Sequence, residues 1–344
     1  MTPDEYMSHD ALGLAELVRD REVTAEELVE IALERTDEYN PAINAVVVRR
    51  DARVLAEAES APPGEFSGVP FMVKDMDGVL ADEPNTASSR SLVTWRPAQD
   101  SELFARYNEV AAANPLSWFP ARRTAEEIAT PGPKNRYVGF PYTKYMNAVI
   151  EVDQAAAVVM TSVGKAREMG VPEEKWVYLH GCAEATDIWH ITERSDYTVS
   201  PAIKLMGEKA FAMAGLTIAD IGLMDLYSCF PSAVEYALDA FGLAEDDPRG
   251  FTVTGGLPYF GGAGNNYVMH SIVTMLEKVR EKRGAYGLVT ANGMYATKHA
   301  CGIYSTIPTK GAWKRENPKD YQKQIDALPR PKVAVEANGE ATIE

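Results

Sequence analysis

The stretch from Gly222 to Thr306 constrains the fold most, because its hydrophobic patterns change in the order of a βαβα unit. A short apolar run from Gly222 to Pro231 predicts a buried strand that ends in a polar loop. Apolar residues then recur at helical intervals from Ser232 to Phe241, and Pro231 stands where the first turn of a helix tolerates proline. The stretch therefore begins with a predicted strand and helix.

The second half of this stretch repeats the pattern. Phe251 to Thr254 is short and β-branched, which predicts a strand, and it leads into a glycine-dense run from Gly255 to Gly264. Asn265 to Glu281 places its apolar residues on one stripe, as an amphipathic helix does. Further strands are predicted at Tyr286 to Ala291 and Cys301 to Thr306, with a loop from Asn292 to Ala300 between them.

Three loops of this unit are expected to converge. Open α/β sheets leave crevices for ligands at the carboxyl ends of their strands. The loops that reach this edge are Tyr227 to Phe230, Gly255 to Asn266 and Asn292 to His299. We therefore expect the functional site among them.

These loops carry a resemblance that covers the chain from about Tyr107 to its end. The sequence resembles the C-terminal half of the thiolase superfamily, most closely the sterol-carrier-associated, acetyl-CoA acetyltransferase-like branch, in which Tyr-Ser-Cys-Phe stands at the place of residues 227–230. The resemblance implies an α/β fold, a mixed sheet with helices on its faces. It also implies acyl transfer on a small or lipid-derived acyl-CoA, with the coenzyme A thioester as substrate and no permanently bound cofactor.

The catalytic set that the resemblance implies is incomplete. Thiolases use a cysteine nucleophile from the N-terminal half, a histidine that activates it and a second cysteine that moves a proton. The segment that bears the nucleophile has no counterpart here, and the histidine's place reads Gly261-Gly262-Ala263. We therefore expect reduced or lost catalysis. The alternative is a non-catalytic module that binds acyl-CoA or a partner protein.

Five residues remain as catalytic candidates: Tyr227, His270, Asn292, His299 and Cys301. His270 lies in the predicted helix, where a histidine is more often a packed side chain than an acid or base. Asn292 follows the strand at which the family places its second cysteine; an amide cannot act as a base, but it could hold a thioester oxygen. Cys301 opens a strand and is typical of a buried core thiol. His299 could reach the crevice from its loop, and Tyr227 could either act or fix the loop's geometry.

The glycine-dense loop supplies the ligand-binding candidates. Its spacing is not that of a dinucleotide or phosphate loop. A glycine-dense turn before a helix still offers backbone N–H donors to an anion or a carbonyl oxygen. We expect thioester or pantetheine contacts from Gly255, Gly256, Gly261, Gly262 and Asn266.

The first hundred residues differ from the rest. Thr24 to Glu27 is a capping box that opens a helix, Asn40-Pro41 is expected to stop it, and strands are predicted at Ile43 to Val48 and Gly68 to Asp75. The order resembles the N-terminal end of the amidase signature family over residues 5–105, as a small α/β segment. In that family the lysine that matches Lys74 is the base of a Ser-Ser-Lys relay.

The amidase relay is also incomplete. A Gly-Ser-Ser-Gly-Gly-like run is missing downstream of Lys74, and Ser88-Ser89 follows the lysine too soon. Lys74 is therefore expected to be a solvated or ion-paired group. An amidase-family hydrolase remains the third reading of the chain, and we do not expect its activity.

The two resemblances meet near Asp100 to Ala113, where one amphipathic helix could span the join. We expect three parts: residues 1–106 amidase-like, 107–170 a connection with the last element of the thiolase N-terminal half, and 171–344 the thiolase-like C-terminal domain. In the connection, Pro115 to Pro133 is expected to be extended, Asp153 to Ser162 a buried strand, and Val163 to Met169 a short helix. Our hypothesis is that the join is a natural gene fusion, a deletion product or an artefact of sequence assembly.

Composition bounds the remaining possibilities. The net charge of −16 would repel nucleic acid, and no run of about 18 apolar residues predicts a membrane span. Three widely spaced cysteines suit reduced thiols in the cytoplasm, and neither they nor the five histidines show metal-ligand spacing. The face that a missing half would cover is expected to drive homo-oligomerisation.

Overall fold

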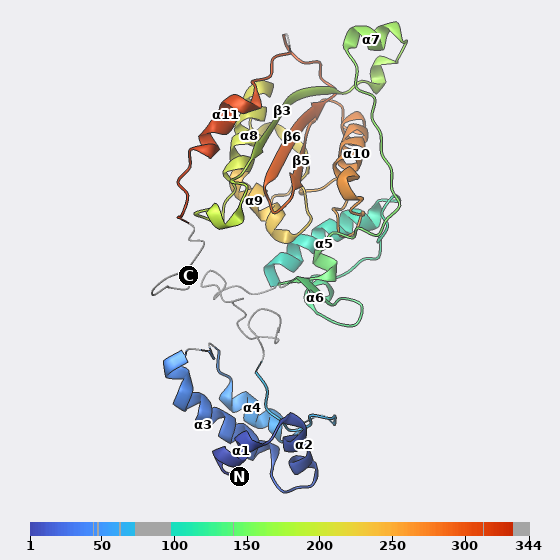
Figure 1. Cartoon of the computed structure of the whole chain (residues 1–344). Helices are drawn as coiled ribbons and strands as arrows, with labels where there is room; N and C mark the ends of the chain where they lie inside the picture. The colour runs from blue at the N-terminus through green and yellow to red at the C-terminus, as the bar shows by residue number, and fades with distance from the viewer. Residues whose placement is uncertain are drawn as a thin grey trace. The chain divides into compact units, whose positions relative to one another are not determined.

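The structure, a computed structural model, describes residues 1–43, 45–46, 48–61, 63–72, 98–139, 141–311 and 313–332. Contacts divide the chain into two compact units, Met1 to Trp95 and Arg96 to Ile343 (Figure 1). Each unit has a hydrophobic core of its own.

The described part of the N-terminal unit is helical. Its helices are α1 (Pro3–Ser8), α2 (Ala11–Arg19), α3 (Ala25–Ile43) and α4 (Asp51–Ala58). Leu14, Val23 and Leu28 form its core. The predicted capping box is confirmed, because Thr24 Oγ accepts from the Glu27 N–H and the Glu27 carboxylate accepts from the Thr24 N–H.

The two strands predicted in this unit are not found among its described residues. Helix α3 continues past Pro41 to Ile43, and residues 45–46 and 48–50 belong to no helix or strand. The Asn40 side chain donates to the Val46 carbonyl and accepts from the Val46 N–H, so it occupies the backbone groups that a strand would pair. The side chains of Phe71 and Met72 are 85% and 73% exposed, so these residues do not belong to the buried strand that was predicted there. Lys74 and Ser88-Ser89 lie outside the described residues.

A four-stranded mixed sheet forms the centre of the C-terminal unit. The strand order is β3-β6-β5-β4, with β3 at Tyr178–Thr186, β4 at Ile221–Asp225, β5 at Tyr286–Gly293 and β6 at Lys298–Ser305. Strands β4 and β5 are parallel, and the other two pairs are antiparallel. The mixed sheet expected from the thiolase resemblance is confirmed.

Helices cover both faces of this sheet (Figure 1). On one face, α8 (Pro201–Ala214) and α9 (Pro231–Phe241) pack against the core that contains Leu288 and Cys301. On the other face, α10 (Tyr267–Glu281) packs Met275 and Val279 against Val289. The predicted helices at 232–241 and 265–281 are thus confirmed within two residues.

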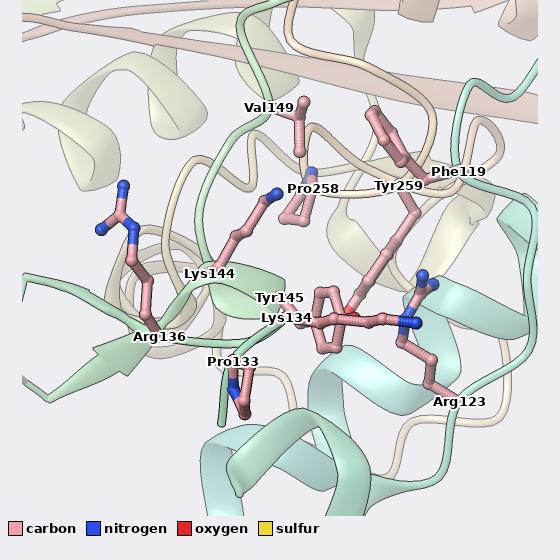
Figure 2. A pocket seen from close by; sticks show the side chains of 10 residues that line it. All are labelled: Phe119, Arg123, Pro133, Lys134, Arg136, Lys144, Tyr145, Val149, Pro258 and Tyr259. Carbon is pink, nitrogen blue, oxygen red and sulfur yellow. The ribbon is translucent and has the colours of Figure 1, made fainter. Parts of the chain in front are cut away.

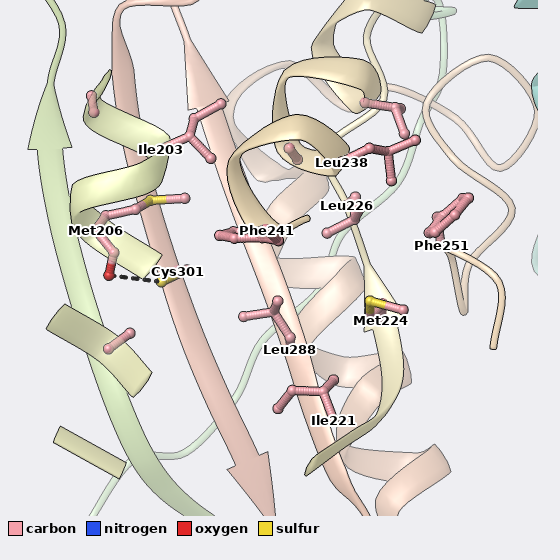
Figure 3. Close-up of a cluster of buried hydrophobic side chains, with 14 of the residues drawn as sticks. Ile203, Met206, Ile221, Met224, Leu226, Leu238, Phe241, Phe251, Leu288 and Cys301 are labelled. Carbon is pink, nitrogen blue, oxygen red and sulfur yellow. Dashed lines mark hydrogen bonds between the residues drawn. The ribbon is translucent and has the colours of Figure 1, made fainter. Parts of the chain in front are cut away.

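The core between the sheet and α8 and α9 is closely packed (Figure 3). Met206 of α8, Phe241 of α9 and Leu288 of β5 meet there. Gly181 of β3 is required at its place, because a Cβ atom would lie 2.1 Å from the Ala210 carbonyl oxygen of α8. Helix and strand therefore touch through their backbones at this point.

Helix α5 (Ala98–Ala113) spans the expected join and belongs to the core of the C-terminal unit. Its residues Leu103, Phe104, Tyr107 and Ala111 are buried in the main cluster. The Tyr107 hydroxyl donates to the carbonyl oxygens of Leu226 and Phe251. The boundary expected at 106 falls inside this helix.

The connection after α5 is less extended than expected. It contains helix α6 (Ala125–Ala129), which Thr124 opens with a capping box to Glu127, and the short strands β1 (Tyr137–Gly139) and β2 (Tyr142–Thr143). Helix α7 (Val163–Glu168) follows as predicted, and α11 (Pro318–Asp326) packs beside β3.

Three further predictions for this unit are wrong. Residues 251–254 form no strand, because the Asp225 carboxylate accepts from the Val253 and Thr254 N–H groups. The loop expected at 292–300 shrinks to residues 294–297, because β5 and β6 pair as far as Gly293 and Lys298. Residues 153–162 form no strand and are not buried, because no described strand lies beside them to pair.

Candidate functional site

A buried carboxylate anchors the glycine-dense loop to the end of β4. Asp225 is fully buried, and its Oδ2 accepts from the N–H groups of Val253 and Thr254 at 3.0 and 3.1 Å. Its Oδ1 accepts from the hydroxyls of Ser271 and Tyr267 on α10, at 2.7 and 3.1 Å. Because several donors surround it, this carboxylate fixes where the loop leaves the sheet.

The first two predicted loops do converge. Ser228 Oγ accepts from the Leu257 N–H at 3.2 Å, and the rings of Tyr227 and Tyr267 meet edge to face at 5.7 Å. The Tyr227 N–H donates to Thr290 Oγ on β5, which ties the loop to the neighbouring strand. Burial raises the pKa of the Tyr227 phenol to about 12, so this hydroxyl keeps its proton at neutral pH.

The glycines of the loop are needed for close packing. A Cβ atom on Gly255 would lie 2.4 Å from Ala111 Cβ of α5, and one on Gly256 would lie 2.5 Å from the Tyr107 ring. Both residues also have positive φ angles of 109° and 79°. Gly261 leaves space for Gln154, and Gly262 donates its N–H to the Val149 carbonyl. Asn266 precedes α10 but makes no capping hydrogen bond.

His270 lies apart from the other histidine and thiol candidates. It sits on α10, 5.5 Å from the Phe260 ring, and its Nε2 has no hydrogen-bond partner among the described residues. Burial lowers its pKa, so the imidazole is neutral at pH 7. Helix α10 covers the face of Val289, whereas Cys301 lies in the core on the opposite face of the sheet. The structure therefore does not bring His270 and Cys301 together.

His299 belongs to a buried polar cluster at the beginning of α8. It lies on β6 rather than in a loop, and its Nε2 is 3.4 Å from Asp187 Oδ2. The Asp187 carboxylate accepts from the Ser200 hydroxyl and from the Ala202 N–H in the first turn of α8, whereas His299 Nε2 has no hydrogen-bond partner among the described residues. Asn292 is the partner of His299 in the β5–β6 ladder, and its Oδ1 has no hydrogen-bond partner among the described residues.

Asp187 was not among the residues predicted from the sequence. The one local signal near this cluster is the Ser200-Pro201 pair, which is typical of a helix start. The cluster pairs a histidine with a carboxylate, but the adjacent donors belong to a helix cap. The hydrogen bonds from the first turn of α8 are therefore enough to explain why the Asp187 carboxylate is buried.

The three thiols are poor nucleophiles in this environment. Burial raises the pKa of Cys229 to about 11 and that of Cys301 to about 12, and it also raises the pKa of Cys182. The Cys301 sulfur faces the Met206 carbonyl oxygen at 3.8 Å, inside the core (Figure 3). A thiol reacts as the thiolate, so the raised pKa values disfavour the reactive form of these groups at neutral pH.

A cationic cavity that sequence reasoning missed lies next to the glycine-dense loop (Figure 2). It has a volume of about 440 Å³. Its cations are Arg123, Lys134, Arg136 and Lys144, and no acidic residue is among the ten that line it: Phe119, Arg123, Pro133, Lys134, Arg136, Lys144, Tyr145, Val149, Pro258 and Tyr259. The cations are spread over 22 positions of the connection between α5 and α7, so no periodic pattern in the sequence gathers them.

Tyr259 gives this cavity an unused hydrogen-bond donor. Its side chain is 1% exposed, its hydroxyl has no partner among the described residues, and Figure 2 shows that hydroxyl pointing toward Tyr145 and Lys134. Burial raises its pKa far above the usual range, so the group remains an O–H donor. Buried donors normally find an acceptor, and this hydroxyl has none among the described residues.

Comparisons with known proteins agree with both resemblances. Residues 183–306 match the thiolase C-terminal domain-like family, and residues 27–113 match the amidase family. A solved SCP2-thiolase-like protein type 1 from Mycobacterium smegmatis, described as monomeric, is 43% identical with a TM-score of 0.68. The match covers 73% of this chain and 56% of that protein.

Two curated relatives show the same division. A 3-ketoacyl-CoA thiolase of Citrobacter koseri is 28% identical over 159 residues, which cover 42% of this chain and 35% of the relative. A lipoamidase of Enterococcus faecalis is 44% identical over 84 residues, which cover 24% of this chain and 12% of the relative.

The chain joins an amidase-like segment to a thiolase-like segment. It spans about half the length of the solved relative and about a third or less of these curated relatives. The five catalytic candidates all lie within the matched residues 183–306: Tyr227, His270, Asn292, His299 and Cys301. Lys74 lies in the amidase-like match, outside the described residues.

Two kinds of feature are absent from the described residues. No group of three or more His, Cys, Asp or Glu side chains could hold a metal ion there. No helix in that part of the chain is long and apolar enough to cross a membrane.

Proposed function

We propose that the thiolase-like segment binds coenzyme A or a small or lipid-derived acyl-CoA, with acyl transfer reduced or lost. The cationic cavity carries this proposal. Its volume of about 440 Å³ falls within the usual range of small-molecule sites. A cluster of four cations is unexpected in a chain with a net charge of −16, and it favours a ligand with several negative charges.

The cavity is connected to the glycine-dense loop by short contacts. Val149 lines the cavity, and its N–H donates to the Leu257 carbonyl while its carbonyl accepts from the Gly262 N–H. Pro258 and Tyr259 of the loop form another part of the wall. A phosphate group among the cations would therefore leave the rest of a coenzyme A thioester beside this loop.

The state of the thiols supports binding rather than rapid transfer. Acyl transfer through a thioester intermediate needs a thiolate and a base within hydrogen-bond reach. The raised pKa values of Cys229 and Cys301 disfavour the thiolate at neutral pH. His270 and Cys301 lie on opposite faces of the sheet.

Calorimetric titration with coenzyme A and with pantetheine, which lacks the phosphates, tests the binding. We expect coenzyme A to bind and pantetheine to bind far more weakly. Arg136→Ala and Lys144→Ala should each reduce the affinity for coenzyme A about fivefold, since an exposed ionic contact contributes roughly 1 kcal/mol. Lys319→Ala removes the same charge from α11, which is not part of the cavity, and should have no effect. Equal binding of both compounds would contradict the proposal.

Turnover is tested separately. Thiolysis of acetoacetyl-CoA should be slow or undetectable, and mass spectrometry should find no acylated cysteine. A steady rate together with an acyl group on any of the three thiols would show that catalysis is retained.

A further inference from the structure

Residues 153–162 carry apolar side chains on the surface without a partner. Val159 is 88% exposed and Met160 is 80% exposed. The described residues form no backbone hydrogen bond with the N–H groups of residues 153–161. Figure 1 shows this segment as a plain trace that leads to α7.

The segment has the pattern of a strand. From Glu151 to Val159 the residues alternate between exposed and half-buried, as in an extended chain whose successive side chains point to opposite sides. Its sequence combines alanines with Val158, Val159 and Met160. An unpaired strand of this kind is a template for pairing with another chain.

We propose that this segment pairs antiparallel with the same segment of a second copy, centred on Ala157. A two-fold axis through this residue places exposed residues opposite each other at 155/159 and 153/161 and half-buried ones opposite each other at 156/158, whereas the half-buried Gln154 lies opposite the exposed Met160. The pairing then sets Ala155 against Val159 and Ala156 against Val158, so that two alanines of each copy meet a β-branched side chain, and Ala157 meets Ala157 on the axis. Asp153 faces the Thr161 hydroxyl, which can donate to its carboxylate.

The distribution of charge favours this arrangement. Glu151 and Asp153 lie at one end, and residues 154–164 carry no charge. Antiparallel pairing places the acidic ends of the two copies about 26 Å apart, eight residues at about 3.3 Å each. That separation exceeds the Debye length of about 8 Å at physiological ionic strength, so the acidic ends do not repel strongly. Parallel pairing would set these carboxylates side by side.

The monomeric state of the solved relative does not decide whether this segment pairs, because part of that protein has no match in this chain. That protein is longer than the matched part of this chain, which covers only 56% of it. The inference also does not depend on the ligand of the cationic cavity, because it rests on residues 153–162 alone.

Sedimentation equilibrium of the full chain tests the register through charge. We expect a dimer that dissociates on dilution. Thr161→Asp places a carboxylate opposite Asp153 of the other copy at both ends of the pair, and it should raise the dissociation constant of the dimer about tenfold. Thr161→Lys places an opposite charge there and should lower the dissociation constant. Thr309→Asp makes the same change at an exposed site outside the segment and should leave the dimer unchanged.

Proline tests the backbone pairing. In an antiparallel pair, alternate N–H groups point to the partner strand, so one of Ala156→Pro and Ala157→Pro must remove a hydrogen bond between copies. That variant should be monomeric with an unchanged circular dichroism spectrum. The proposal is overturned if the wild-type chain is a monomer at every concentration, if Thr161→Asp and Thr309→Asp behave alike, or if both proline variants remain dimers.

Discussion

Glu235 should make the stability of the C-terminal unit depend on pH, and replacing it with glutamine should remove much of that dependence. Burial, followed by a hydrogen bond and charge repulsion from Asp100, raises the pKa of Glu235 to about 8. Asp100 is 5% exposed and lies on α5, whereas Glu235 lies on α9. The two carboxyl groups therefore share a proton between these helices.

The sign of the effect follows from proton binding. The folded unit keeps the proton on Glu235 up to about pH 8, whereas the unfolded chain releases it near 4.5. Between these values the folded state binds more protons, so the free energy of unfolding falls as pH rises. The upper limit is about 1.4 kcal/mol per pH unit, or about 5 kcal/mol over the window. Because Glu235 is only partly buried, solvent screening should reduce the total to about half.

Urea denaturation at several pH values between about 5 and 8.5 measures the free energy of unfolding over most of the range between the two pKa values of Glu235. The buried Trp176 reports on the C-terminal unit. Glu235→Gln keeps the size of the side chain and a donor for Asp100. Its stability should rise relative to the wild-type chain by about 2 kcal/mol across the window.

Glu277→Gln is the matched control, because Glu277 is exposed on α10 and belongs to no recorded ion pair among the described residues. Its stability should follow the wild-type chain at each pH. Parallel curves for Glu235→Gln and the wild-type chain would refute the shared proton.

The remaining predictions concern the anchor, the cavity and the thiols. Asp225→Ala leaves several buried donors without an acceptor and should cost about 3 to 5 kcal/mol in urea denaturation; a loss below about 1 kcal/mol contradicts the anchor role. Tyr259→Phe removes a hydroxyl that has no partner among the described residues, so the free energy of unfolding should not fall. The affinity for coenzyme A should fall, and both quantities can be measured on one preparation. Alkylation of Cys229 by iodoacetamide should be slow at pH 7 and accelerate toward pH 11; rapid labelling at pH 7 contradicts its raised pKa.

The elements of the C-terminal unit were predictable where pattern and local chemistry agree. Pro231 marks the beginning of α9, and the apolar stripe from Val268 to Val279 marks α10. Both signals act within a few residues, so the sequence alone contains them. The strand predicted at residues 251–254 is wrong for the opposite reason. Their β-branched residues fit a strand, but the distant Asp225 takes up their N–H groups.

The candidate site was predictable only in part. The convergence of residues 227–230 with the glycine-dense loop followed from the order of strands and helices. The cationic cavity did not, because Arg123 and Lys144 come together only when the chain between them folds back. The sequence also could not predict that His270 and Cys301 lie on opposite faces of the sheet, because this depends on which face α10 covers.

Helix α5 explains how two partial resemblances can share one folded unit. The amidase match extends to residue 113, yet Leu103, Phe104 and Tyr107 pack in the core of the thiolase-like segment. Tyr107 also binds the carbonyl groups of Leu226 and Phe251, and Ala111 lies against Gly255. An amphipathic helix can pack in a core if its side chains have the right volume and make a few hydrogen bonds, whichever family its sequence resembles. The join therefore lies in an element that the C-terminal unit needs for its core and for the glycine-dense loop.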